Sequence, residues 1–262
     1  MYGCEMGNHF HGLLENTKQE CEESYAFNVV KYLAKIVDYV CQKHPEAIFD
    51  FDITEGGRCA GLSFLSSGKF FAVNNGPYYQ DYDIQIEDGK WTNIFVTPGP
   101  SRTWICRKVL EYDRWIPSVL FLTHYLPDDD STSQMLNLAS LILGQNGIWG
   151  DLLSVSVEGV KLFGDILGSY KHIREDITEA YPKVTGEPGE TFEVHEKINT
   201  ANGCGVIALF ANLPGTYTYK VKQKTNEKVM IYGDVTVEFC EDDIVITATY
   251  SKANVVIVFF GV

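Results

Sequence analysis

The sequence predicts a mixed fold in which a layer of alternating strands and helices precedes a small all-β domain. Before about residue 180, apolar runs of strand character alternate with segments of helical spacing, which is typical of βα units around a parallel sheet. After the Gly- and Pro-containing stretch 179–190, short strand-like runs follow one another with a turn signal about every 8–12 residues, which is typical of an antiparallel sandwich. We therefore expect domains at 1–180 and 188–262.

The first part of the chain predicts about four βα units. A helix is indicated at 24–43, where apolar residues recur at helical spacing, Ser24 can act as N-cap and Pro45 ends the pattern. Each predicted strand is an apolar run that ends in polar or turn residues. The predicted strands are 47–54, 68–77, 92–100 and 118–127, and further helical patterns lie at roughly 102–113, 131–144 and 157–177. Four such units make half of an eight-stranded TIM-type barrel, a fold that builds its sites from the carboxyl ends of the strands.

The second part has no helical pattern between its strand-like runs. We predict six strands, at 191–198, 205–211, 216–222, 229–239, 243–250 and 254–260. Turn signals such as Asn-Gly and Leu-Pro-Gly separate them, so a sandwich of about 75 residues is expected.

The stretch AIFDFDITEGGR, residues 47–58, is unusual for a core strand. Because side chains alternate along a strand, Asp50, Asp52 and Thr54 share one face. Three interpretations stay open: a polar face in water, a face that points into a polar site, or a pair of carboxylates that binds a divalent cation. No P-loop or Rossmann glycine signature accompanies the two aspartates, so we expect no metal and no cofactor.

Composition limits the partners and the compartment. The chain has 262 residues and a net charge of −14, so it should repel phosphate backbones, and we expect no nucleic acid partner. There is no run of 18 apolar residues, so no membrane span is expected. The seven cysteines are scattered and form no CxxC pair, which is typical of reduced thiols in a cytoplasmic protein.

Several segments together resemble the second half of a melibiase-type α-galactosidase, a retaining clan D glycoside hydrolase with a TIM barrel followed by a C-terminal β-domain. The segments are HPEAIFDFDITEGGR, GKFFAVNNGPYY, LASLILGQNGIWGDLLSVSVEGVKLFGDILGSYKHIRED and the β-rich tail, in that order. The most specific part is 150–176, which is similar to the last barrel loop and helix of that family and ends in Tyr-Lys-x-x-Arg. The matches together span roughly residues 24–262.

The resemblance implies an α-galactoside-like sugar as ligand and assigns site residues. Asp52 and Arg58 fall on the family's sugar contacts at strand five. Asn74 and Asn75 fall where the family carries its acid/base Asp, and Asp50 lies one layer deeper on the same strand. With these residues we expect a glycoside hydrolase of the α-galactosidase or α-N-acetylgalactosaminidase type.

The chain also departs from the family pattern at the two catalytic carboxylates. No Lys-x-Asp nucleophile motif precedes Ser24, and the amide of Asn74 cannot move a proton as an acid/base must. We therefore expect the nucleophile-bearing half to be missing. Two alternatives remain: a non-catalytic carbohydrate-binding or scaffold half-barrel, and an intact enzyme in which Asp50 or Asp52 is the catalytic residue. Because four strands cannot close into a barrel, we also expect a homodimer or pairing with a complementary half-barrel chain.

Overall fold

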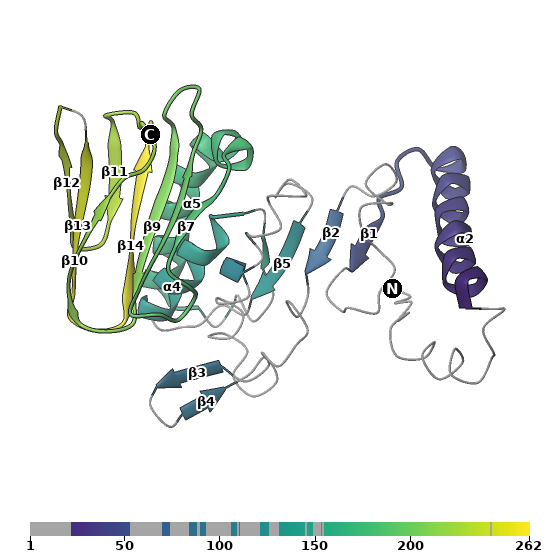
Figure 1. The fold of residues 1–262 in the computed structure, drawn as a ribbon, viewed down its shortest axis with the longest axis horizontal. Helices are drawn as coiled ribbons and strands as arrows, with labels where there is room; N and C mark the ends of the chain where they lie inside the picture. Colours follow the sequence, from purple (N-terminus) through teal and green to yellow (C-terminus); the bar gives the residue numbers. More distant parts are fainter. Residues whose placement is uncertain are drawn as a thin grey trace.

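The computed structural model describes residues 22–52, 70–73, 84–87, 90–92, 106–108, 110, 121–125, 131–144, 146–148, 153, 155–241 and 243–262. Figure 1 shows helix α2 at one end of the molecule, a small parallel sheet in the middle and a β-sandwich flanked by two helices at the other end.

The middle layer is a parallel sheet with the strand order β1-β2-β5-β6. Its strands are β1 (Asp50–Asp52), β2 (Phe70–Val73), β5 (Phe121–Tyr125) and β6 (Gly147–Ile148). The parallel pairing of β1 with β2 confirms the prediction for the segments 47–54 and 68–77. Mixed helix and sheet content is therefore established, whereas closure into part of a barrel stays a prediction.

The predicted third parallel strand, 92–100, lies outside the described residues except for Thr92. Strand β2 pairs directly with β5, with no strand between them. Thr92 ends β4 (Lys90–Thr92), which forms an antiparallel hairpin with β3 (Ile84–Glu87), and residues 93–100 lie outside the described part of the chain. The fourth parallel strand is instead β6, which is only two residues long and therefore too short for its alternation to be visible in sequence.

Three long helices lie close to their predicted positions. They are α2 (Glu22–Lys43), α4 (Ser131–Leu141) and α5 (Val157–Glu179). Helix α5 begins after Ser156, whose hydroxyl accepts a hydrogen bond from the Gly159 amide at 3.0 Å and so satisfies one of the first backbone donors.

The C-terminal part is a sandwich of two antiparallel sheets. The larger sheet has the order β11-β14-β9-β8-β7 and the smaller one has the order β10-β13-β12. The strands are β7 (Lys183–Thr185), β8 (Phe192–Ile198), β9 (Gly205–Ala211), β10 (Gly215–Lys220), β11 (Val229–Tyr232), β12 (Val235–Phe239), β13 (Ile244–Tyr250) and β14 (Asn254–Phe260).

Two details of the sandwich differ from the sequence prediction. The run 229–239 is two strands, because Gly233 adopts a φ of 107° between β11 and β12 and sends them into different sheets. Strand β7 lies before residue 188, so the larger sheet already begins inside the segment that the composition marked as a link.

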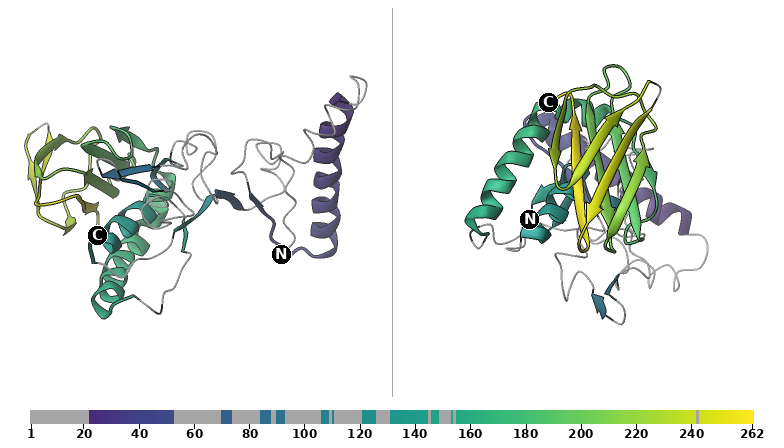
Figure 2. Two further views of the ribbon diagram at one scale, coloured as in Figure 1. Left: turned by 90° about the horizontal axis from the view of Figure 1, so that it is seen from below. Right: turned by 90° about the vertical axis from the view of Figure 1, so that its left-hand side faces the viewer.

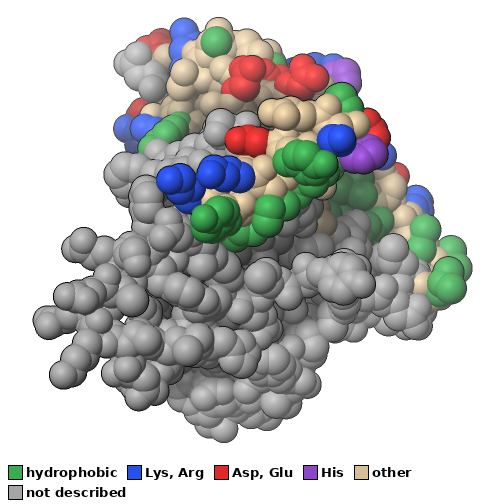
Figure 3. All heavy atoms as spheres, turned by 90° about the vertical axis from the view of Figure 1, so that its right-hand side faces the viewer, with side chains coloured by type: hydrophobic (Ala, Val, Ile, Leu, Met, Phe, Trp, Pro, Cys, Tyr) green, Lys and Arg blue, Asp and Glu red, His purple; other side chains and the backbone are tan. Residues whose placement is uncertain are grey.

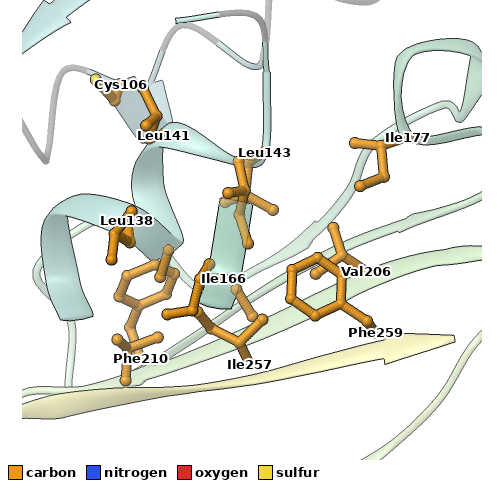
Figure 4. Close-up of a cluster of buried hydrophobic side chains, with 14 of the residues drawn as sticks. Cys106, Leu138, Leu141, Leu143, Ile166, Ile177, Val206, Phe210, Ile257 and Phe259 are labelled. Atoms are coloured by element: carbon orange, nitrogen blue, oxygen red, sulfur yellow. The ribbon is translucent and has the colours of Figure 1, made fainter. Parts of the chain in front are cut away.

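Hydrophobic residues cover both faces of the larger sheet. One face packs on the smaller sheet through residues such as Ile207, Leu209 and Ile246, which are fully buried. The other face packs on α4 and α5, and Figure 4 shows Leu138 and Ile166 lying over Phe210, Ile257 and Phe259. The larger sheet therefore lies between two hydrophobic cores and contributes side chains to both.

Within the described residues, none of the helices is both long and apolar enough to cross a bilayer.

Candidate functional site

The carboxyl ends of the parallel strands lie at one edge of the sheet, where ligand sites form in α/β proteins. The backbone register pairs Asp52 with Ala72 and Val73 with Thr123. Further along β5, His124 pairs with Gly147 of β6. The last residues of four strands that are distant in sequence are thus brought to a common edge.

The structure places two of the five predicted site residues and leaves the others outside its described part. Asp50 and Asp52 are the first and last residues of β1. Arg58, Asn74 and Asn75 lie outside the described residues, although Asn74 directly follows β2. On the neighbouring strand, Asp52 is paired with Ala72, and Asn74 follows Ala72 by two residues in the sequence. The convergence of these side chains stays a prediction.

A second polar cluster, which the sequence reasoning missed, is buried where the βα part meets the sandwich. Glu193 on β8 accepts hydrogen bonds from Nε of Arg107 and, at 3.2 Å, from its Nη2. The other Arg107 nitrogen, Nη1, donates to the Ser140 hydroxyl of α4 at 3.0 Å, and the guanidinium lies 4.2 Å above the ring of Phe210. His195 Nε2 lies 2.5 Å from Glu193 Oε1.

The charges in this cluster support one another. Burial alone would raise the pKa of Glu193, but the charge of Arg107, together with hydrogen bonds from His195 and Arg107, lowers this pKa from 4.5 to about 2. Burial lowers the pKa of His195 despite its hydrogen bond to Glu193. At neutral pH the cluster is thus an ionised Arg–Glu pair with a neutral histidine beside it.

The cluster joins two layers and is closed to ligands. Arg107, Glu193 and His195 are at most 4 % exposed, so no substrate reaches them in this structure. The sequence did carry a signal: in FEVHEKI, the residues 193, 195 and 197 put Glu, His and Lys on one face of a buried strand. Such a face needs partners, and here Glu193 has one in Arg107, which is itself bonded to Ser140 of α4.

Helix α4 carries two further buried amides with unmet hydrogen-bonding groups. Within the described part of the chain, the side-chain Nε2 and Oε1 of Gln134 and Nδ2 of Asn137 have no hydrogen-bond partner, and both residues are almost fully buried. Among the described residues, no group of three or more His, Cys, Asp or Glu side chains is arranged to hold a metal ion.

Comparison with known proteins gives a structural likeness without a sequence relationship. No family model and no curated protein matches the chain. The GH36 alpha-galactosidase AgaA from Geobacillus stearothermophilus, crystallised in complex with raffinose, matches with a TM-score of 0.59 and 13 % identity over 87 % of this chain and 30 % of that chain. The alpha-galactosidase from Lactobacillus brevis matches with a TM-score of 0.59 and 12 % identity over 88 % of this chain and 31 % of that chain.

The likeness extends to other proteins of the same kind. The galactosidase domain of the alpha-galactosidase-sucrose kinase AgaSK has a TM-score of 0.53 and 11 % identity, over 87 % of this chain and 31 % of that chain. The present chain spans less than a third of the length of these three structures. At these identities the comparison concerns the fold: the chain has the melibiase-type, glycoside hydrolase-like fold of one part of a GH36 alpha-galactosidase.

Proposed function

We propose that this chain forms the sugar-binding part of a glycoside hydrolase site of the α-galactosidase or α-N-acetylgalactosaminidase type, and that by itself it binds an α-galactoside without hydrolysing it. The observation that carries the proposal is the parallel pairing of β1 with β2 inside a fold shared with GH36 alpha-galactosidases. This pairing sets Asp52 at the carboxyl edge of the sheet, beside the strand that leads into Asn74.

The neighbours' ligands support the choice of sugar. AgaA has been crystallised with raffinose, with stachyose and with 1-deoxygalactonojirimycin, and all three matches cover 87 % of the present chain. An α-galactosyl group is therefore the ligand to test first.

The proposed roles follow from the chemistry of the side chains. In our proposal the carboxylate of Asp52 accepts, and the guanidinium of Arg58 donates, hydrogen bonds to sugar hydroxyls, and the amides of Asn74 and Asn75 can do both. Asp50 lies two residues before Asp52, about 6–7 Å deeper along the strand. We expect it to be held by a backbone amide or a basic group, since an unpaired buried carboxylate would be costly.

Hydrolysis by this chain alone is not expected. A retaining glycosidase needs two carboxyl groups about 5–5.5 Å apart, one as nucleophile and one as acid/base. In the register implied by the resemblance, an amide occupies the acid/base position at Asn74, and no Lys-x-Asp motif is present in the chain.

A binding titration with raffinose tests the site. We expect saturable binding that weakens by roughly tenfold to a hundredfold in Asp52→Asn, because a hydrogen bond to a charged group is worth about 1.5–3 kcal/mol. Asp38→Asn, on the exposed surface of α2, is the matched control and should leave the affinity unchanged. Equal affinity in the two variants would contradict the assignment of Asp52.

A turnover assay with an aryl α-galactoside separates the proposal from its alternative. We expect no product above background at micromolar protein. Robust hydrolysis that is lost in Asp52→Asn but kept in Asn74→Ala would instead identify an intact enzyme with Asp52 as its catalytic carboxylate.

A further inference from the structure

Helix α2 carries an apolar surface that nothing in the described chain covers. Val37 is 2 % exposed and marks the buried side of the helix. Tyr32, Ile36 and Tyr39 follow one another at i, i+4 and i+7, so they form one stripe along the helix. They are 61 %, 56 % and 60 % exposed, and we name them the α2 ridge.

The two flanks of α2 differ in chemistry. Successive residues of a helix are 100° apart around its axis, and this places the α2 ridge on one flank of the buried side. On the other flank lie three exposed polar residues, Lys31, Asp38 and Gln42. Lys35 and Lys43 hold their ammonium groups 5.4 Å from the ring centres of Tyr32 and Tyr39. Figure 3, which looks onto the side where α2 lies, shows hydrophobic side chains next to basic ones. We expect the polar flank to stay in contact with water and the apolar ridge to bind a protein partner.

The same chain has a groove on the sandwich side of the molecule. It lies between α5 and the edge strand β11, has a volume of about 670 Å³, and is lined by Gly164, Asp165, Gly168, Met230 and Tyr232 among others. A Cβ atom built on Gly164 or Gly168 would meet nothing within 4 Å, so the helix surface there is open. On the β11 side, Met230 lines the groove and is 43 % exposed, and on α5 the side chain of Val160, one turn before Gly164, is 56 % exposed.

The ridge and the groove do not meet within one molecule. Figure 1 and the left view of Figure 2 show α2 at the end of the molecule away from the sandwich, with the parallel sheet between them. A contact between the two surfaces therefore requires two molecules.

We propose that a second copy of this chain inserts its α2 ridge into the groove between α5 and β11. Ridges of residues four apart pack into grooves of residues four apart, and Tyr32–Ile36 and Gly164–Gly168 have this same spacing. Asp165 lies between the two glycines and gives Lys35 of the other copy a carboxylate to face. Each copy has one ridge and one groove, so a two-fold dimer contains the contact twice.

Charge disfavours the simplest alternative, a pairing of α2 with α2. In an antiparallel pair centred on the ridge, Lys35 of each copy would lie near the middle of the contact, close to the same charge on its partner. The groove instead offers the carboxylate of Asp165 on its α5 side, with Lys228 on its β11 side. The inference concerns assembly only and does not depend on whether the chain binds a sugar.

Sedimentation velocity between about 1 and 100 μM tests the proposal. We expect a dimer of the 29.5 kDa chain. Replacing two ridge residues, in Tyr32→Ser/Tyr39→Ser, should raise the dissociation constant by at least roughly a hundredfold, because buried aromatic anchors dominate such interfaces. Lys31→Ser/Gln42→Ser, on the polar flank of the same helix, is the control and should leave the dissociation constant within about threefold, as expected for rim positions.

Variants of the groove test the other half of the contact. Gly164→Leu and Gly168→Leu should fold, since both sites have room and leucine favours helix, yet they should fill the groove and dissociate the dimer. A ridge variant mixed with a groove variant still has one intact ridge and one intact groove, so the mixture should regain a dimer that neither variant forms alone.

Three results would overturn the proposal. A wild-type chain that sediments as a single 29.5 kDa species at 100 μM shows that the ridge does not bind a second copy. A dimer that survives in the ridge variant excludes α2. A dimer that is lost in the ridge variant but kept in both groove variants places the ridge on another surface.

Discussion

The Arg107–Glu193 pair is a residue-level link between the βα part of the molecule and the sandwich. The pair is buried, and its bonds are complete: Glu193 also accepts the Gly189 amide at 3.2 Å, and Arg107 also bonds Ser140. A buried ion pair is weak evidence for net stability, because the desolvation of both charges offsets their attraction. The pair instead fixes how the two parts are positioned, because burying either charge is costly unless the other lies beside it.

Removal of the carboxylate should therefore be strongly destabilising. We expect Glu193→Gln to lower the free energy of unfolding by about 3–5 kcal/mol, because the guanidinium of Arg107 stays buried without its counter-charge. Urea unfolding followed by circular dichroism measures this loss. The control is Glu227→Gln, on an exposed carboxylate, which should change the free energy of unfolding by less than about 0.5 kcal/mol. A similar loss in both variants would mean that the buried pair has no special part in stability.

The same pair makes the fold sensitive to acid. The folded pKa of Glu193 is about 2, below its ordinary 4.5, so the unfolded chain binds more protons at low pH. This contribution to stability is complete above about pH 5 and is lost as the pH falls towards 2. Burial of His195, which lowers its pKa, acts in the same direction below its ordinary 6.5. We expect the urea midpoint to fall between pH 5 and 3, and to fall less in Glu193→Gln; equal slopes in the two proteins would contradict the assignment.

At the scale of the elements, long segments with a clear period could be predicted from the sequence and short ones could not. The helix α5 and the strands β8, β9, β13 and β14 lie within a few residues of their expected ranges. Strand β6 has two residues and no period to detect, so it is absent from the predicted strands.

The run 229–239 illustrates a different cause of error. Its apolar alternation continues through Gly233 and Asp234, so the pattern indicates one strand. The break depends on the backbone conformation of Gly233, which the pattern does not encode. The candidate site shows the same limit: residues 50 and 52 could be assigned to a strand, but which strands lie beside them is decided by tertiary packing.

The turn at Gly233 can be tested directly. We expect Gly233→Ala to destabilise the protein by about 1–3 kcal/mol, because the residue keeps a φ of 107° that alanine rarely adopts. The new Cβ would also lie 2.6 Å from Cγ1 of Val256 on β14. Gly168→Ala is the comparison, since its Cβ has open space and a helical backbone, and it should stabilise or be neutral. Thermal unfolding of the two variants gives both values, and equal melting temperatures would refute the turn argument.

At the scale of the whole molecule, the two predicted domains share a hydrophobic core. The outer face of the larger sheet places Val206, Phe210, Ile257 and Phe259 against α4 and α5, and all four side chains are buried. The predicted boundary near residue 180 marks a change in sequence pattern, from alternating strands and helices to successive strands. The packing suggests that the folding unit is larger and includes both helices and Arg107.

This leads to a prediction about fragments. A chain of residues 181–262 keeps both sheets but exposes the face that α4 and α5 cover, and Glu193 on that face loses its partner Arg107. A chain of residues 102–262 keeps the helices and the ion pair. Apolar surface is worth about 25 cal/mol per Å² when it is removed from water, so exposing a whole sheet face outweighs the few kcal/mol by which a small domain is stable. We expect the longer fragment to unfold cooperatively in urea and the shorter one to aggregate or to unfold without a sharp transition. A shorter fragment that unfolds cooperatively at the same urea midpoint would show that the sandwich is an independent domain, and that the helices merely rest against it.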